Sequence, residues 1–296
     1  MQGRKWNQNW TFQKNGAEPV PVTLPHDAML TEKRDPDCRN GKQTGFYPGG
    51  KYTYTKRFRY SAGKAPSFCG VEFEAVYCRS RVYLNDVPVG EWPYGYTGFL
   101  ADLKDHLVDG ENELRVEVDN SGEPGSRWYS GAGIFRDVWL WESEKDGCIL
   151  PHGIKVQTLS ATDREARIRV QVNARYPKEE GWEILLDVRK NGETVVRGSG
   201  SDVVLSVRDP LFWSDESPEL YEIRCTLMQD GEVIDTAAET FGIRTLEWEA
   251  GKGLLVNGRE VLLRGGLHSS RQRDSRRLRV QGRRREENPD LKGKRL

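Results

Sequence analysis

Short runs of alternating apolar and polar residues recur along most of the chain, between turns rich in Gly, Pro, Asn and Asp. Alternation with a period of two is typical of β-strands that are buried on one face. Helical spacing is almost absent, so the pattern predicts an all-β protein. Strands are predicted at 51–60, 70–77, 81–90, 112–120 and 137–143, and then at 154–160, 166–174, 182–192, 202–207 and within 220–244.

Dipeptides that favour tight turns separate several of these runs. Asn, Asp and Gly tolerate the left-handed backbone that two-residue β-hairpin loops require. The predicted hairpin turns are Asn85-Asp86, Asn191-Gly192, Asp230-Gly231 and Asn257-Gly258.

The strand spacing divides the chain into successive regions. Residues 1–146 are predicted to form a sandwich or jelly roll, because short strands follow one another at the spacing that is typical of these folds. Residues 147–244 hold about seven strands, which fits an immunoglobulin-like sandwich without its Cys–Trp–Cys pattern. Residues 245–266 form a further hairpin, and from residue 267 the apolar period is lost.

Composition narrows the possible partners. No apolar run approaches the roughly 20 residues of a membrane span, and the N-terminus lacks an apolar signal region, so we expect no membrane partner. Five cysteines without a CxxC spacing and only four histidines offer no zinc template. We therefore expect no metal, no cofactor, reduced thiols and a cytoplasmic location.

The formal net charge of zero hides an asymmetry. Residues 267–296 carry eleven basic and four acidic side chains, whereas the rest of the chain carries thirty-four and forty-one. The body is therefore mildly acidic, and an acidic surface does not attract a nucleic-acid backbone. We expect no nucleic-acid partner for it.

Eight motifs occur in an order and spacing that resemble glycoside hydrolase family 2, which contains β-galactosidases, β-glucuronidases and β-mannosidases. The resemblance covers about residues 1–266. The motifs are WNQNWTF (6–12), LPHD (24–27), GFYPGG (45–50), VYLN (82–85), RWYSGAGIFRDVWL (127–140), FGIRT (241–245), LVNG (255–258) and LRG (263–265).

The resemblance implies a jelly-roll sugar-binding-type domain, an immunoglobulin-like sandwich and then a (β/α)₈ barrel. The hairpin at 245–266 would lead into that barrel, which in this family carries two catalytic glutamates for retaining hydrolysis. A barrel needs about 250 residues, so we expect only its truncated start here. We nominate no catalytic residue, and we expect the chain alone to be inactive.

Four aromatic or basic residues are candidates for contact with substrate. In the family, the loop that corresponds to Arg127, Trp128 and Tyr129 reaches toward the barrel mouth and can meet the sugar. Tyr47 in the GFYPGG loop is a candidate for the same kind of contact. Guanidinium groups bind hydroxyls or carboxylates, and aromatic faces stack on sugar rings. The structural alternative is that Trp128 and Tyr129 pack between domains and Arg127 pairs with a carboxylate.

His26 and Asp27 are a second candidate pair. They could orient one another as an acid–base pair, but beside Pro25 they are more typical of turn residues, with Asp27 capping a short turn. We favour the turn.

The basic segment 267–296 has three interpretations: an arm for nucleic acid or membrane, a generic disordered extension, or a frameshift. We favour a disordered, frameshifted tail, because codons can be chosen so that the frame displaced by one base encodes a family-like His-rich loop and amphipathic helix. The nucleotide sequence tests this interpretation.

The expected family role is therefore retaining hydrolysis of β-glycosides, with β-galactosides favoured, and the expected partner is carbohydrate, bound weakly or not at all without the barrel. The alternative is a non-catalytic carbohydrate-binding or structural β-sandwich protein.

Overall fold

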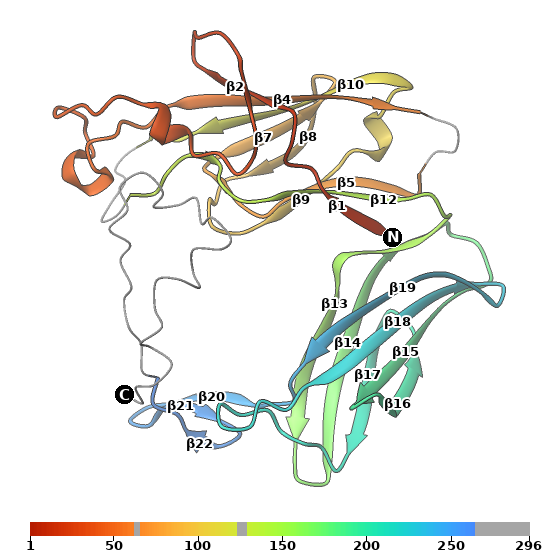
Figure 1. The fold of residues 1–296 in the computed structure, drawn as a ribbon. Helices are drawn as coiled ribbons and strands as arrows, with labels where there is room; N and C mark the ends of the chain where they lie inside the picture. The colour runs from red at the N-terminus through yellow and green to blue at the C-terminus, as the bar shows by residue number, and fades with distance from the viewer. Residues whose placement is uncertain (62–65, 123–128, 264–296) are drawn as a thin grey trace. The chain divides into compact units, whose positions relative to one another are not determined.

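The computed structural model describes residues 1–61, 66–122 and 129–263. Every regular element in these ranges is a β-strand or a short 3₁₀ helix, which confirms the all-β class (Figure 1). The chain divides into two compact units. The first consists mainly of described residues between 3 and 140, and the second of residues 141–263 with 1–2 and 66–68.

The first unit is a β-sandwich. One sheet has six strands in the order β3 (Val20–Val22), β2 (Trp10–Lys14), β4 (Lys51–Tyr60), β10 (Gly110–Asp119), β7 (Ser80–Leu84) and β8 (Val87–Trp92). The other has four, in the order β1 (Gln2–Lys5), β12 (Val138–Ser143), β5 (Phe68–Phe73) and β9 (Phe99–Asp102). The remaining elements are the pair β6 (Val76–Tyr77) and β11 (Gly133–Ile134) and the 3₁₀ helices η1 (Ala28–Thr31), η2 (Gly41–Thr44) and η3 (Lys104–His106).

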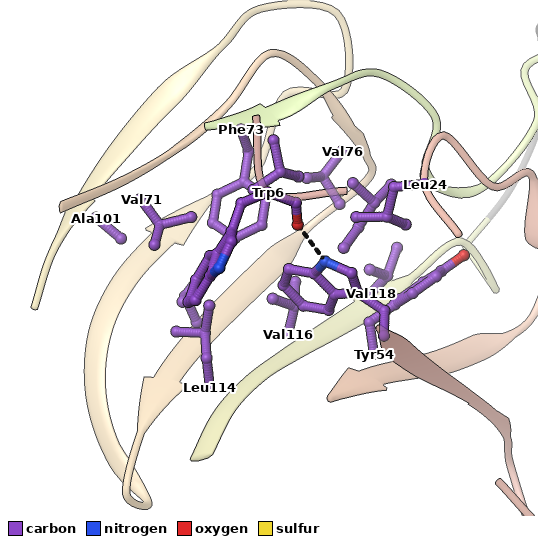
Figure 2. Packing of buried hydrophobic residues seen from close by; sticks show 14 of the residues in the cluster. Trp6, Leu24, Tyr54, Val71, Phe73, Val76, Ala101, Leu114, Val116 and Val118 are labelled. Carbon is purple, nitrogen blue, oxygen red and sulfur yellow. Dashed lines mark hydrogen bonds between the residues drawn. The ribbon is translucent and has the colours of Figure 1, made fainter. Parts of the chain in front are cut away.

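Strand alternation builds the core of this unit (Figure 2). Val116 and Val118 of β10 point inward from one sheet, and Val71 and Phe73 of β5 come from the other; all four are buried. Period-two alternation sends every second side chain of a strand to the same face, so both sheets contribute an apolar face to one interior.

Two tryptophans and a lysine form an aromatic corner of the same core. The indole N–H of Trp10 donates to the Trp6 carbonyl at 2.8 Å (Figure 2). Lys56 of β4 is only 5% exposed, and its amine lies 4.7 Å from the Trp6 ring centroid while donating to the Gln8 carbonyl. Burial, followed by the charge of Arg4, lowers the pKa of Lys56 to about 8.

The predicted hairpin turns are confirmed. Asn85 and Asp86 have φ of 50° and 65° and join β7 to β8, whose paired residues begin at Leu84 and Val87. Both turn residues are therefore in the left-handed conformation of a two-residue hairpin.

The second unit contains another two-sheet sandwich. Three strands form one sheet in the order β13 (Cys148–Ala161), β14 (Glu165–Arg175) and β17 (Asp202–Arg208). Four form the other in the order β16 (Glu193–Ser199), β15 (Trp182–Lys190), β18 (Tyr221–Gln229) and β19 (Glu232–Phe241). The predicted turns at Asn191-Gly192 and Asp230-Gly231 have positive φ throughout and join paired strands.

A small sheet follows the second sandwich: β20 (Leu246–Glu249), β21 (Gly253–Val256) and β22 (Arg259–Glu260). Asn257 and Gly258 form the predicted turn between β21 and β22. Trp248 is 78% exposed, and Leu262 and Leu263 are each 74% exposed. The predicted frameshifted segment at 267–296 lies outside the described residues.

Among the residues that the structure describes, no helix has the length and apolar character needed to cross a membrane.

Candidate functional site

Of the four predicted substrate-contacting residues, two belong to the described part of the chain. Arg127 and Trp128 lie outside the described residues. Tyr129 and Tyr47 are both described, and each is partly buried.

Tyr47 and Tyr129 lie side by side although 82 residues separate them in the chain. Their ring centroids are 5.9 Å apart at an interplanar angle of 71°, an edge-to-face contact. The Arg34 guanidinium lies 5.1 Å from the centroid of the Tyr47 ring. The loops of Tyr47 and Tyr129 therefore bring their two rings into contact, and the Arg34 guanidinium lies over the Tyr47 ring.

Local backbone structure sets the position of Tyr47. The helix η2 ends at Gly45, whose φ of 68° turns the chain, and Phe46 is also left-handed at 66°. The buried hydroxyl of Thr44 then donates to the Tyr47 carbonyl at 2.9 Å. A left-handed turn suits glycine, which explains Gly45 in the GFYPGG motif.

Asp27 is the residue that anchors the loop of Tyr129. It is 2% exposed, and its Oδ2 accepts the Tyr129 hydroxyl at 3.0 Å. Its Oδ1 accepts the backbone N–H of Ala132 at 3.0 Å and of Met29 at 3.1 Å. Asp27 thus caps η1, as the sequence predicted, and also fixes the loop 129–132.

His26 does not act as the acid–base partner of Asp27. Its Nδ1 lies 2.8 Å from the Tyr54 hydroxyl. Burial lowers the pKa of His26, and burial together with the nearby Asp27 charge raises the pKa of Tyr54 well above its usual value. Both groups are therefore neutral at pH 7, and this pair has a structural role.

Backbone conformation and close packing explain why two positions of the RWYSGAGIF motif are glycine. Gly131 and Gly133 have φ of 69° and 89°, a region that disfavours other residues. A Cβ atom on Gly133 would lie 2.1 Å from the Tyr54 hydroxyl oxygen. The motif therefore packs its backbone directly against the His26–Tyr54 pair.

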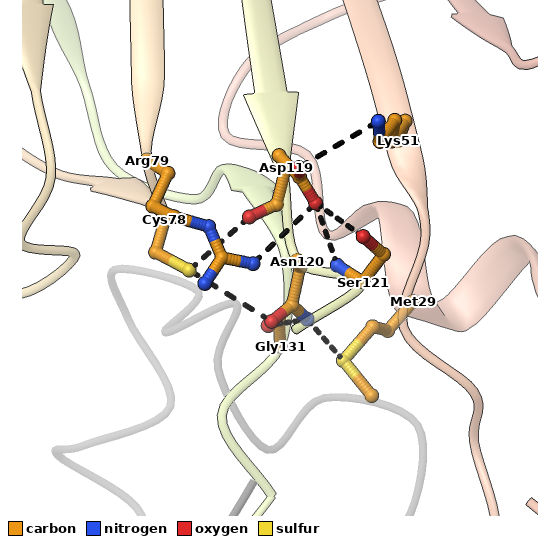
Figure 3. Close-up of polar contacts among 8 residues, drawn as sticks. All are labelled: Met29, Lys51, Cys78, Arg79, Asp119, Asn120, Ser121 and Gly131. Atoms are coloured by element: carbon orange, nitrogen blue, oxygen red, sulfur yellow. Dashed lines mark hydrogen bonds and ion pairs between the residues drawn. The ribbon is translucent and has the colours of Figure 1, made fainter. Parts of the chain in front are cut away.

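Asn120 connects the end of β10 to the same loop (Figure 3). Its side-chain amide donates to the Gly131 carbonyl at 3.1 Å and lies 3.3 Å from the sulfur of Met29. The Cys78 thiol lies 3.4 Å from the Asp119 carbonyl on the other side. The predicted strand at 112–120 includes Asn120 only as its last residue. The position of Asn120 between that strand and a glycine-rich loop is the signal in the sequence that points to this role.

Asp119, next to Asn120, is an ion-pair centre at the C-terminal end of β10 (Figure 3). Its carboxylate accepts the Ser121 hydroxyl at 2.6 Å and faces Arg79 at 3.4 Å and Lys51 at 3.9 Å. Burial opposes ionisation, but the hydrogen bonds from Ser121 and the Arg79 charge outweigh it and hold the pKa of Asp119 below its usual value.

The arrangement around Asp27 is suited to binding rather than to proton transfer. It presents two tyrosine rings in contact, of which Tyr129 is bound to the buried Asp27 carboxylate and Tyr47 lies beside the Arg34 guanidinium. The neighbouring imidazole of His26 is neutral and contacts the Tyr54 hydroxyl. Among the described residues, no group of three or more His, Cys, Asp or Glu side chains is placed to hold a metal ion.

Comparisons with known proteins agree with the fold and the motifs. The model of glycosyl hydrolases family 2 matches residues 152–244. The β-galactosidase BoGH2A of Bacteroides ovatus is 34% identical over 82% of this chain. A β-glucuronidase of Bacteroides fragilis is 26% identical over 66% of it.

Solved structures resemble the chain along nearly all of its described length. A β-glycosidase from Bacteroides vulgatus aligns with a TM-score of 0.75 and 26% identity over 88% of the chain. A family 2 glycosyl hydrolase from Bacteroides cellulosilyticus aligns with a TM-score of 0.73 and 28% identity over 90%.

The fold and motifs define an all-β protein that contains two β-sandwiches. The chain belongs to glycosyl hydrolase family 2. It spans 30% of the length of the Bacteroides ovatus relative and 31% of the Bacteroides fragilis relative. It likewise covers 36% and 38% of the two solved chains.

Proposed function

We propose that this chain supplies the β-sandwich portion of an enzyme that hydrolyses β-glycosides with retention, with β-galactosides as the favoured substrates. Family membership and the β-galactosidase among the relatives support this assignment. The observation that carries it is the ring contact between Tyr47 and Tyr129, with the Tyr129 hydroxyl bound to the buried carboxylate of Asp27.

The role that we propose for Tyr47 and Tyr129 is contact with the sugar substrate. Aromatic rings stack on the apolar faces of pyranoses, and a preorganised ring loses little freedom on binding. The Asp27 hydrogen bond holds Tyr129 in place, and the ring contact with Tyr129 restrains Tyr47. Arg127 and Trp128 belong to the same proposal on the strength of the motif alone.

We further propose that the chain of 296 residues by itself does not hydrolyse glycosides, requires no cofactor, and interacts with neither nucleic acid nor membrane. Retaining hydrolysis uses two carboxylates about 5–5.5 Å apart, and the family places them in a (β/α)₈ barrel. The described residues form β-sheets and 3₁₀ helices, with no α-helix among them.

The test of inactivity uses the purified chain with a chromogenic β-galactoside and a chromogenic β-glucuronide. No release of the chromophore is expected with either substrate. Turnover that survives rigorous purification would contradict the proposal. Sugar binding without turnover that is lost in Tyr47→Ala or Tyr129→Ala, measured by calorimetry, would favour a non-catalytic carbohydrate-binding protein instead.

The role of the tyrosines is tested in a chimera that carries residues 1–263 of this chain in place of the matching part of the Bacteroides ovatus β-galactosidase. Tyr47→Ala and Tyr129→Ala are expected to raise KM for a β-galactoside about tenfold, which corresponds to about 1.4 kcal/mol. Tyr94→Ala is the control, because Tyr94 is 56% exposed and outside the Tyr47–Tyr129 pair. Unchanged KM in both site variants would refute the role.

A further inference from the structure

A polar groove crosses the outward face of the six-stranded sheet in the first unit. Its volume is about 500 Å³, within the usual range of ligand sites. The strands β2, β4, β10, β7 and β8 contribute to its lining. The groove is separate in its residues from the cluster of Asp27, Tyr47 and Tyr129.

One continuous rung of polar side chains forms the floor of this groove. Strand register pairs Gln13 with Thr53, Thr53 with Glu117, Glu117 with Arg81, and Arg81 with Glu91. All five residues line the groove. Neighbouring strands lie about 4.8 Å apart, so the rung extends about 19 Å across the sheet, which is long enough to contact several pyranose rings.

The rung offers hydrogen-bond donors and acceptors in alternation. An amide and a hydroxyl are followed by a carboxylate, a guanidinium and a second carboxylate. The Arg81 side chain is 60% exposed, and its Nε lies 3.5 Å from Glu91, a contact that engages one of its five N–H donors. Glu117 is oriented by Arg115 of the same strand, and its side chain remains 42% exposed. The Arg81 guanidinium and the Glu117 carboxylate are therefore oriented by ion pairs and remain accessible to the hydroxyl groups of a ligand.

The charge of the groove selects against a polyanion. Four basic and three acidic side chains line it, so its field is nearly balanced. A polyphosphate or polyuronate would meet carboxylates as well as cations, whereas sugar hydroxyls both donate and accept hydrogen bonds and suit a mixed surface.

We propose that this groove is a binding site for a neutral oligosaccharide, which lies across the sheet along the rung from Gln13 to Glu91. The site does not depend on hydrolysis by this chain or by a longer enzyme. It would hold a glycan chain on the sandwich itself.

The test titrates the 296-residue chain with cellohexaose, mannohexaose and galactotetraose, and with trigalacturonate as an anionic probe, by calorimetry and by NMR line broadening of the sugars. At least one neutral oligosaccharide is expected to bind at millimolar concentration. The groove variants are the double substitution Arg81→Ala/Glu91→Ala and the single substitution Glu117→Ala. Each is expected to weaken that binding at least tenfold.

The matched control is Arg59→Ala/Glu111→Ala, which removes another cross-strand ion pair, with a 2.6 Å contact, from the same face but outside the groove lining. Its affinity for the sugar should stay within twofold of the unsubstituted chain. All variants should keep the thermal midpoint, since exposed ion pairs contribute little to stability.

The proposal would be overturned if none of the neutral oligosaccharides binds, or if only trigalacturonate binds. It would also be overturned if the groove variants bind the sugar with unchanged affinity. These results are independent of the chromogenic assays, so failure of the groove leaves the hydrolase proposal standing, and the reverse also holds.

Discussion

The buried carboxylate of Asp27 should be one of the most sensitive positions in the first unit. Replacement by alanine removes the acceptor for the N–H groups of Met29 and Ala132 and for the Tyr129 hydroxyl. A buried donor left without a partner costs about 1–3 kcal/mol, and loss of a helix cap costs about 1 kcal/mol. We expect Asp27→Ala to lower the free energy of unfolding by about 3–5 kcal/mol.

Two milder substitutions separate the contributions of the carboxylate. Asp27→Asn keeps an oxygen for the two backbone N–H groups and offers an NH₂ to Tyr129, so we expect a loss of about 1–2 kcal/mol. Tyr129→Phe removes one hydrogen bond from a partly exposed side chain and should cost about 1 kcal/mol. The control Glu111→Ala changes an exposed carboxylate (63% exposed) and should stay within about 0.5 kcal/mol.

The assay is urea unfolding, with hydrogen exchange followed in peptides covering 26–35 and 129–135. Because the chain has two units, the exchange data locate the change in the first one. Faster exchange confined to these two peptides is expected for Asp27→Ala. A variant whose free energy of unfolding stays within about 1 kcal/mol of that of the unsubstituted chain would refute the reasoning, because two buried N–H groups and the Tyr129 hydroxyl lose their acceptor.

Three further predictions concern other parts of the chain. The free energy of unfolding of the unsubstituted chain should rise by between about 1 and 3 kcal/mol as the pH rises from about 8 toward 10.5, because the unfolded chain binds more protons than the folded chain in that range, and Lys56→Met should abolish this rise. Urea unfolding that shows the same pH dependence for Lys56→Met and the unsubstituted chain would contradict the prediction. Gly133→Ala should lower the free energy of unfolding by more than about 2 kcal/mol, whereas Gly110→Ala should lower it by about 1 kcal/mol, because Gly110 has φ of 92° but open space around it. If thermal melts show that adding Tyr54→Phe does not restore any stability to Gly133→Ala, the predicted clash with the Tyr54 hydroxyl is wrong. Burial raises the pKa of Cys225 to about 12 and also raises that of Cys148, whereas Cys38 is only partly buried. Mass spectrometry after iodoacetamide treatment at pH 8 should therefore find Cys38 labelled faster than Cys225 and Cys148, and equal labelling of Cys225 would show the packing to be looser than described.

Local sequence patterns predicted most of the strands, because alternation and turn chemistry act over a few residues. The run at 51–60 became β4 (Lys51–Tyr60) with the same bounds, and Asn85-Asp86 turned where expected. Among the strands that were missed are Trp10–Lys14 and Glu193–Ser199. The first alternates but has only five residues, and the second exposes most of its side chains and shows little alternation.

The candidate site contains contacts that could not be predicted from local sequence patterns. The sequence pointed to Tyr47, Tyr129 and a capping role for Asp27 from motifs and turn preferences. It could not show that Asp27 accepts from Tyr129 and Ala132, because these partners lie more than a hundred residues away. Such contacts depend on the packing of two loops, which no local period encodes.

Local alternation, turn dipeptides and motifs are enough to establish the all-β class, the positions of the hairpin turns and the family. The packing of distant segments is needed to show that His26 pairs with Tyr54 rather than with Asp27, and that the Tyr54 hydroxyl leaves no room for a side chain at Gly133. It also assembled the rung from Gln13 to Glu91, since strand order and register bring five separate segments side by side. Periodicity sets which face of a strand is polar, whereas the pairing of strands sets which polar groups meet.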